Sequence, residues 1–134
     1  MKELKLMASD ETLAEVLDAI ESQLIENGCS DSMRIAILIA AEEIYVNIAH
    51  YAYGGEAGEA IVQLDTTPNT FKAVFKDRGI PYNPLAKEDP DITLSIEERE
   101  IGGLGVFMVK ETMDRVDYSY TDGYNVFTME KDLK

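Results

Sequence analysis

The stretch that decides the fold is residues 34–53, which reads RIAILIAAEEIYVNIAHYAY. Its apolar side chains recur at helical spacing, in a line formed by Ile37, Ala41, Ile44 and Ile48. This spacing predicts a helix that buries one face in the core. Glu43 and Asn47 stand four residues apart, so their side chains project from the same side of that helix.

The pair formed by Glu43 and Asn47 could carry chemistry. A carboxylate can accept a proton from a hydroxyl group or from water, and a carboxamide oxygen is a hard ligand that suits Mg²⁺. Taken alone, a Glu-x-x-x-Asn spacing is more often a solvated helix edge. His50, the only histidine, we interpret as a partly buried structural side chain rather than as a base.

The segments on either side of this helix are predicted from apolar patterns and turn residues. Upstream, we expect an edge strand at 2–7 and then a helix that begins after a cap at Ser9 or Asp10. Downstream, we expect strands at 60–65, 70–77, 115–120 and 124–131 and a short helix at 104–113. This order predicts one α+β domain over 1–134, a two-layer α/β sandwich with the helices on one face of a mixed, mostly antiparallel sheet.

The composition is strongly acidic: 12 Lys and Arg stand against 26 Asp and Glu in 134 residues, a net charge of −14. A nucleic-acid-binding protein would show a basic face, and an anionic membrane would repel this chain, so both are disfavoured as partners. No apolar run reaches the ~20 residues of a membrane span, and no signal region is visible, so a cytoplasmic location is expected. Cys29 is the only cysteine, which excludes an internal disulfide and a multi-cysteine metal site.

A second motif, Asp77-Arg78-Gly79-Ile80-Pro81, ends the strand expected at 70–77. A carboxylate at a strand end can accept a hydrogen bond from an exocyclic amine such as adenine N6, and a glycine lets the backbone approach a flat ligand. Taken alone, an ordinary turn rich in Asp, Gly and Pro is the plainer interpretation.

A third motif, Gly102-Gly103-Leu104-Gly105, opens the helix expected at 104–113. Backbone N–H groups at such an opening can converge on an anion, which an acidic chain would need in order to hold phosphate. A flexible joint is the plainer interpretation. Arg99, just upstream, could reach a terminal phosphate or pair with a neighbouring glutamate.

In their order and spacing, the three motifs resemble those of the GHKL ATPase superfamily, whose members have the Bergerat ATP-binding fold. Within it, the chain resembles the anti-sigma factor/serine-protein kinase family. Glu43-x-x-x-Asn47 resembles the N box of that family, Asp77-x-Gly79-x-Pro81 its G1 box, and the glycine-rich motif its G2 box. The resemblance extends from the first expected helix to the last expected strand.

The resemblance implies a role for each matched residue. Glu43 would be the general base, Asn47 would coordinate the Mg²⁺ bound to ATP, and Asp77 would bind the adenine amine with Gly79 beside the base. The remaining nucleotide contacts would come from Gly102, Gly103, Leu104 and Gly105 at the phosphates, from Arg99 in an ATP lid at 81–102, and from Thr128 in the last strand.

The resemblance therefore implies a cytoplasmic, Mg-ATP-dependent kinase that phosphorylates a serine on a STAS-type anti-sigma-factor antagonist. A sigma factor and a second copy of the chain are further partners that it implies. Three alternatives stay open. They are a nucleotide-gated binding module that transfers no phosphate, a plain ATP hydrolase, and a structural domain with a decayed site.

Overall fold

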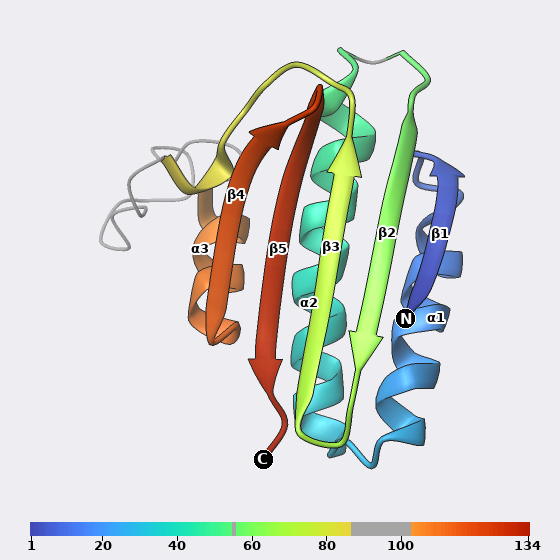
Figure 1. The fold of residues 1–134 in the computed structure, drawn as a ribbon, viewed down its shortest axis with the longest axis vertical. Coiled ribbons are helices and arrows are strands. Elements are labelled where there is room, and N and C mark those ends of the chain that lie inside the picture. The colour runs from blue at the N-terminus through green and yellow to red at the C-terminus, as the bar shows by residue number, and fades with distance from the viewer. Residues whose placement is uncertain (55, 87–102) are drawn as a thin grey trace.

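Five strands form a single sheet in the order β1-β2-β3-β5-β4 (Figure 1). The structure is a computed structural model that describes residues 1–54, 56–86 and 103–134. Along the chain, the strands are β1 (Lys2–Met7), β2 (Glu59–Thr66), β3 (Thr70–Asp77), β4 (Arg115–Thr121) and β5 (Tyr124–Asp132). All four pairings between these strands are antiparallel. The sequence predicted a mixed, mostly antiparallel sheet, and the described sheet is antiparallel throughout.

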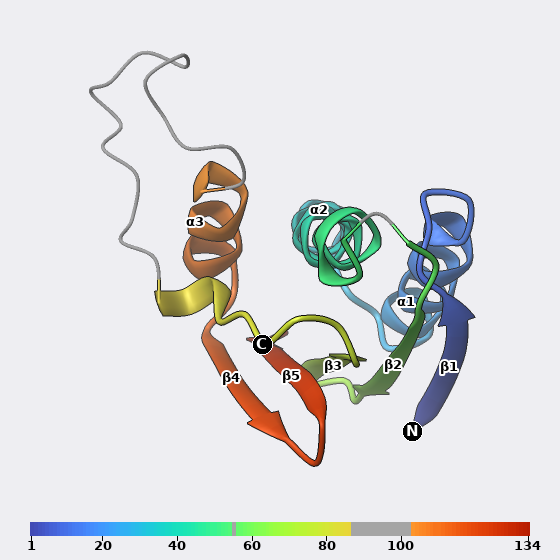
Figure 2. The same cartoon turned by 90° about the horizontal axis from the view of Figure 1, so that it is seen from above.

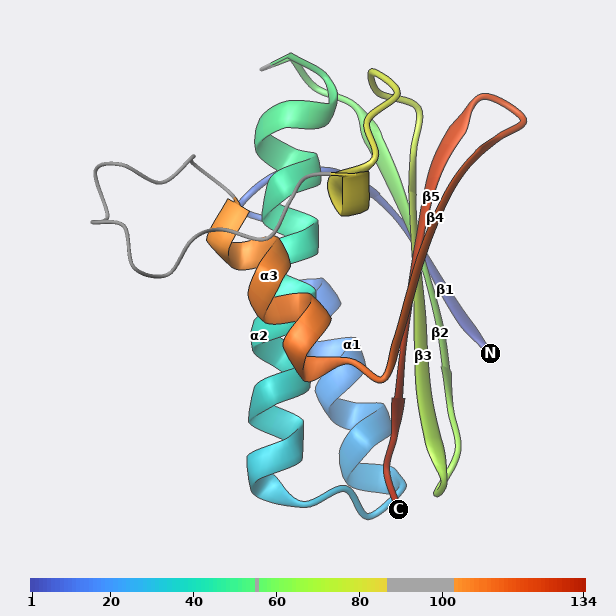
Figure 3. The ribbon, with the colours of Figure 1, turned by 90° about the vertical axis from the view of Figure 1, so that its left-hand side faces the viewer.

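In the described part of the chain, three helices cover one face of this sheet, as can be followed in the two rotated views (Figures 2 and 3). They are α1 (Leu13–Glu26), α2 (Asp31–Asn47) and α3 (Gly103–Thr112). Two short helical segments complete the layer: the π-helical turn η1 (Ile48–Ala52), which continues α2, and the 3-10 turn η2 (Pro84–Ala86). The predicted α+β sandwich is therefore confirmed.

The core lies between the helices and the inner face of the sheet. Side chains alternate across a strand, and in β3 the inward positions Phe71 and Phe75 are almost completely buried. Each contributes ~2 kcal/mol to folding by leaving water. On the other layer, Ile37 and Ile44 of α2 are buried at helical spacing, as their line in the sequence predicted.

The first helix begins later than a cap at Ser9 or Asp10 would require. Helix α1 starts at Leu13, and Thr12 precedes it without a side-chain capping bond. The Thr12 hydroxyl is already engaged: it donates to the carbonyl of Met7 at 2.9 Å and lies 2.6 Å from the hydroxyl of Tyr45 on α2. These contacts anchor the turn between β1 and α1, and the helix can form only after it.

The hairpin between β4 and β5 turns at Asp122 and Gly123. Both residues have positive φ, 55° and 83° respectively, which is the backbone of a tight two-residue hairpin turn. The turn sets the register in which β5 returns along β4 and pairs with β3 on its other side. In that register Asn125, two residues after Gly123, lies opposite Asp77 at the end of β3.

The helical segment 31–52 is 22 residues long and, by length and composition alone, could cross a membrane. The expectation that no stretch reaches this length was therefore wrong for this segment. The structure uses it as a core helix: Ile37, Ala40, Ala41, Ile44 and Tyr45 are buried in α2. A core helix of a folded domain can have the same length and composition as a membrane span.

Candidate functional site

A cavity of about 490 Å³ opens between the helical layer and the sheet, where β3 ends and β5 begins. Figure 2 views the molecule from this end. The volume falls in the range of small-molecule sites. Most of the wall is apolar or aromatic. The lining residues are Ile44, Asn47, Ile48, Tyr51, Ala52, Phe75, Asp77, Ile80, Tyr82, Pro84, Val106, Tyr118, Asn125 and Phe127.

Two buried polar side chains, Asp77 and Asn125, lie in this wall. They are only 6% and 7% exposed, and they are the polar or charged side chains in the described part of the chain that are this deeply buried. Oδ1 of Asp77 accepts hydrogen bonds from Nδ2 of Asn125 and from the backbone N–H of Gly79, both at 2.9 Å. No described residue donates to Oδ2 of Asp77, so that oxygen is left for a ligand. The structure thus brings the aspartate predicted from the sequence into a cavity.

The turn after Asp77 is held against the end of the central helix. The backbone N–H of Ile80 donates to the carbonyl of Ala52 at 2.9 Å, and that of Arg78 donates to the hydroxyl of Tyr53 at 2.8 Å. A Cβ at Gly79 would lie 2.1 Å from the carbonyl oxygen of Ala52. Glycine is therefore required here for the approach to η1, which is a reason different from contact with a flat ligand.

Glu43 and Asn47 lie near this cavity on one side of α2, as their spacing predicted. Asn47 lines the cavity, and Glu43, one turn earlier, is not among the described lining residues. The two side chains are half-buried, and Nδ2 of Asn47 donates to Oε1 of Glu43 at 3.3 Å. This bond orients the amide and leaves its Oδ1 able to bind a metal ion or to accept a hydrogen bond.

The glycine-rich motif is only partly described. Gly103 begins helix α3, so Gly103, Leu104 and Gly105 form its first turn, and Val106 of the same turn lines the cavity. The first backbone N–H groups of a helix lack partners inside the helix. Gly102, Arg99 and the rest of the predicted lid beyond Ala86 lie outside the described residues.

Two other candidate residues do not contribute to the cavity. Thr128 lies between Phe127 and Met129, which face the core, so its side chain lies on the opposite face of β5. His50 is 45% exposed rather than partly buried, and its Nε2 lies 2.7 Å from Oδ1 of Asp10. That contact ties the end of α2 to the turn before α1, which supports the structural interpretation of His50.

The sequence interpretation missed Asn125 and the tyrosines around it. The hydroxyl of Tyr118 donates to Oδ1 of Asn125, and burial raises the pKa of that tyrosine. A signal was available: in β5, Asn125 shares its two-residue alternation with Phe127 and Met129, and so it is a polar residue on the core face of a strand. We expected the last-strand contact at Thr128, which lies on the other face.

The charges in the wall set what could bind. Asp77 is the only Asp, Glu, Lys or Arg among the described lining residues. The described residues also contain no group of three or more His, Cys, Asp or Glu side chains that could hold a metal ion. The described wall therefore offers one anionic acceptor, neutral amides and aromatic surface. Such a wall suits a flat base with an amino group, and it provides no fixed cation for phosphate.

Comparisons with known proteins point to one family. A family profile described as histidine kinase-like ATPase domain matches residues 6–131. The serine/threonine-protein kinase BtrW of Bordetella bronchiseptica is 24% identical over 127 residues, which are 94% of this chain and 89% of BtrW. The serine-protein kinase RsbW of Bacillus cereus is 27% identical over 92 residues, which are 66% of this chain and 58% of RsbW. The match therefore spans less than two thirds of RsbW.

Two solved structures share the fold. One contains the RsbU and RsbW domains of Rv1364c from Mycobacterium tuberculosis, with a TM-score of 0.64 and 16% identity over 99% of this chain and 33% of that one. The other is the nucleotide-free catalytic domain of the histidine kinase ThkA, with a TM-score of 0.56 and 12% identity over 99% of this chain and 98% of that one. At these identities the likeness concerns the fold alone.

Proposed function

Because the chain belongs to the histidine kinase-like ATPase domain family, we propose that it is an ATP-dependent protein serine kinase. Its proposed substrate is a serine on a STAS-type anti-sigma-factor antagonist. Family membership implies the use of ATP, and BtrW and RsbW are named as protein kinases. The observation that carries the nucleotide part of the proposal is the buried carboxylate of Asp77 in the wall of a cavity of suitable size.

The proposed base site uses the one carboxylate oxygen that the described residues leave unbonded. Oδ2 of Asp77 accepts a hydrogen bond from the exocyclic amine of adenine, and Phe75 and Val106 supply apolar surface for the ring. A carboxylate only accepts hydrogen bonds. A guanine or hypoxanthine would turn a carbonyl oxygen toward it and would bind more weakly.

The proposed phosphate site relies on neutral groups and on a divalent cation. Oδ1 of Asn47 is the proposed protein ligand of Mg²⁺, which takes most of its ligands from phosphates and water. The first turn of α3, at Gly103, Leu104 and Gly105, offers backbone N–H groups to the phosphates. Gly102 and Arg99 are assigned to the phosphates as well. In a chain of net charge −14, we expect nucleotide binding to depend strictly on the divalent cation.

Glu43 is the proposed general base. When bound, Mg-ATP would supply the γ-phosphoryl group, with ADP as the leaving group. Glu43 would accept the proton of the substrate serine as the serine oxygen forms its new bond to phosphorus. Because Glu43 contacts Asn47 through a 3.3 Å hydrogen bond, one turn of α2 presents both the base and the metal ligand. The substrate hydroxyl would have to approach along this turn, at the margin of the cavity.

One observation favours a second candidate, a nucleotide-gated binding module without phosphotransfer. Glu43 is absent from the described lining of the cavity, and one of its oxygens is occupied by Asn47. In such a module, the pair would orient the metal ligand, and the output would be the binding of a partner. A plain ATP hydrolase is the third alternative, in which Glu43 would activate water.

The first experiment tests nucleotide binding by thermal unfolding. Mg-ADP at 100 times its Kd should stabilise the protein by ~2.7 kcal/mol, because a ligand of the native state shifts the unfolding equilibrium. GDP with Mg²⁺, and ADP with EDTA, are the controls and should give much smaller shifts. An unchanged melting temperature with millimolar Mg-ADP would contradict the proposal that the protein binds nucleotide.

The second experiment tests phosphotransfer with a matched pair of variants. Glu43→Gln should keep ADP binding and lose transfer to the antagonist serine by ~100-fold or more, the usual range for a lost general base. Glu42→Gln removes the same charge from the neighbouring exposed position and should keep both activities. If the wild type binds ADP but phosphorylates none of the STAS proteins of its genome, the binding module is favoured; steady ATP turnover without any protein substrate favours the hydrolase.

The remaining expectations concern partners and location. A sigma factor and a second copy of the chain are proposed as further partners, by resemblance alone. The acidic surface disfavours direct binding to nucleic acid and to anionic membranes. A cytoplasmic location fits a kinase of soluble regulators and is part of the same proposal.

A further inference from the structure

Asn125 makes more hydrogen bonds than any other side chain described around the cavity. Its Nδ2 donates to Oδ1 of Asp77 at 2.9 Å, and also lies 3.1 Å and 3.4 Å from the carbonyls of Ile80 and Gly79. Its Oδ1 accepts from the backbone N–H of Tyr82 at 3.1 Å and from the hydroxyl of Tyr118. A carboxamide has two donors and two acceptor lone pairs, so all of its capacity is used.

These bonds join three parts of the cavity wall that are distant in the sequence. Asn125 lies at the start of β5, directly opposite Asp77 at the end of β3. The residues whose backbone it contacts, Ile80 and Tyr82, themselves line the cavity. One side chain therefore holds the carboxylate and the chain segment that follows it in a single arrangement.

The chemistry of the contact decides which oxygen of Asp77 faces a ligand. The N–H groups of Asn125 and Gly79 both bond to one carboxylate oxygen, Oδ1, so turning the carboxylate out of its present plane would break two hydrogen bonds. Oδ2 is thereby kept as the free acceptor. Among the common side chains, an amide suits this place, because it donates to a carboxylate and accepts from an N–H at the same time.

We propose that Asn125 is a positioning residue for base recognition, which holds Asp77 in the orientation that selects adenine, through its exocyclic amine, over bases that present a carbonyl oxygen at this position. This inference rests on the proposed nucleotide site. It assigns a role to a residue that need not touch the nucleotide. Loss of the side chain should therefore weaken the binding of adenine nucleotides selectively, and not the binding of all nucleotides alike.

The sharpest test is Asn125→Asp, measured as ADP affinity against pH and divided by the wild-type value at each pH. Two carboxyls in this contact raise the pKa of one of them, because like charges resist joint ionisation. While the pair holds one proton, the introduced carboxyl can donate to Oδ1 of Asp77 as the amide did, and affinity should be close to wild type. Above the raised pKa, relative affinity should fall about tenfold per pH unit.

The other titratable groups around the pair do not obscure this test. Near the pair lie several tyrosines, one arginine and one glutamate. The tyrosines are Tyr118 and Tyr120 of β4, Tyr82 before η2, Tyr51 of η1 and Tyr53 after it. The charged groups are Arg78, which lies 4.6 Å from the ring centre of Tyr124, and Glu59, whose charge acts on Tyr53. Because the affinity of the variant is divided by the wild-type value at each pH, titration of groups that both proteins share cancels from the ratio. A transition between pH ~5 and ~8 in the variant alone therefore belongs to the carboxyl pair.

A second variant separates positioning from packing. Asn125→Ala should lower ADP affinity by ~10-fold or more, while inosine diphosphate, which lacks the amine, should change by less than ~3-fold; one hydrogen bond to a charged group accounts for a difference of this size. Asn69→Ala is the matched control, since it makes the same change at an exposed position in the hairpin between β2 and β3, outside the described cavity lining, and it should leave the affinity for both nucleotides unchanged. Equal losses for both nucleotides, or an Asn125→Asp ratio that is flat with pH, would overturn the proposal.

A measurement without nucleotide keeps this inference distinct from the proposed function. In the wild type, the Tyr82 amide should exchange slowly with solvent, and in Asn125→Ala it should exchange faster by ~10-fold or more, because it loses its hydrogen bond to Oδ1 of Asn125. If the wild type binds no ADP, the proposed function fails whatever the exchange rates are. If ADP binds and the Tyr82 amide exchanges at the same rate in both proteins, the positioning role fails.

Discussion

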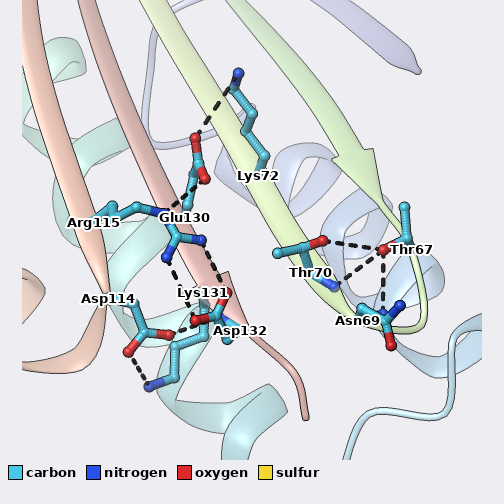
Figure 4. Close-up of polar contacts among 9 residues, drawn as sticks. All are labelled: Thr67, Asn69, Thr70, Lys72, Asp114, Arg115, Glu130, Lys131 and Asp132. Atoms are coloured by element: carbon cyan, nitrogen blue, oxygen red, sulfur yellow. Dashed lines mark hydrogen bonds and ion pairs between the residues drawn. The ribbon is translucent and has the colours of Figure 1, made fainter.

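Strands β3 and β5 carry two polar clusters, one at each end of their pairing, and the two are built differently. At the cavity end, Asp77 and Asn125 are buried, and a hydrogen bond joins the carboxylate of Asp77 to the neutral amide of Asn125. At the other end, an exposed cluster of ion pairs joins β3, β4 and β5 (Figure 4). It consists of Lys72, Asp114, Arg115, Glu130, Lys131 and Asp132.

The exposed cluster is centred on Arg115. Its guanidinium lies 3.0 Å from Glu130 and 2.9 Å from Asp132, and these hydrogen bonds raise its pKa above the ordinary value. Arg115 and Asp132 are exposed and Glu130 is half-buried, so water weakens the attraction and opposite charges gain little from pairing. The comparison teaches that the number of polar contacts does not measure their importance. The buried pair has one hydrogen bond between its side chains and adjoins the oxygen that is proposed to recognise the base. The exposed cluster is richer in contacts and joins three neighbouring strands at the surface of the sheet.

The largest effect is expected at the cavity end, from Asp77→Asn. The amide would turn either an N–H or a carbonyl toward the adenine amine, and it would disturb the donors of Gly79 and Asn125. We expect ADP affinity to fall by ~100-fold, in keeping with the loss of hydrogen bonds to a charged acceptor. Calorimetric titration measures this, and far-UV circular dichroism checks the fold. Retained affinity would mean that the buried carboxylate does not recognise the base.

The next largest effect is expected from Gly79→Ala, and it is an effect on the free energy of unfolding. The new Cβ would lie 2.1 Å from the carbonyl of Ala52, so the turn must move away from η1. Overpacking of this kind costs ~1–3 kcal/mol in the free energy of unfolding. Gly123→Ala is the control: nothing lies within 4 Å of its Cβ position, and only its positive φ opposes the change, at ~1 kcal/mol. Urea unfolding compares the two, and a smaller cost at Gly79 would contradict the tight approach.

A smaller effect is expected from Arg115→Ala at the exposed end. Removal of the guanidinium should lower the melting temperature slightly, by less than Gly79→Ala does. The difference from wild type should vanish near ~1 M salt, where charges are screened beyond a few ångströms. The effect of Gly79→Ala should not depend on salt in this way. A large and salt-independent loss in Arg115→Ala would remove the contrast between the two ends.

The smallest effect is expected in the acid range, from Asp132→Asn. The hydrogen bond from Arg115 lowers the pKa of Asp132 below its ordinary value. The stabilisation is therefore present above the unfolded-state pKa near ~3.9 and is lost as the pH falls through the lower folded-state pKa. Wild type should be slightly more stable than the variant at pH ~6 and equal to it near pH ~2. Equal stability of the two proteins at pH ~6 would contradict this expectation.

The fold was largely predictable from the sequence, for identifiable reasons. The line of Ile37, Ala41, Ile44 and Ile48 identified the central helix, and turn residues located both hairpins. The start of α1 was not predictable, because it depends on the contact between Thr12 and Tyr45, which are 33 residues apart. The π-helical turn at the end of α2 also left no pattern in the sequence. In both cases, a tertiary contact or a backbone irregularity decides the local structure.

The site was predictable where a motif is local and not where it depends on strand pairing. The spacing of Glu43 and Asn47 needs only a helix, and Asp77 needs only the end of a strand. Asn125 becomes meaningful only when the register of β3 and β5 is known. An odd offset along the strand changes the face, so the contact expected at Thr128 falls on the wrong side of the sheet. The requirement for Gly79 likewise comes from a distant backbone carbonyl, which no local pattern reveals.

The tyrosines of the cavity have a practical consequence. The chain has seven tyrosines and no tryptophan, so its intrinsic ultraviolet emission comes from tyrosine alone. Three of the seven, Tyr51, Tyr82 and Tyr118, are in the cavity wall, and Tyr53 bonds to the turn beside it. The molecule thus carries its own optical probe at the place where a ligand would enter. Occupancy could be followed in unlabelled protein, with phenylalanine substitutions assigning the signal to one ring at a time.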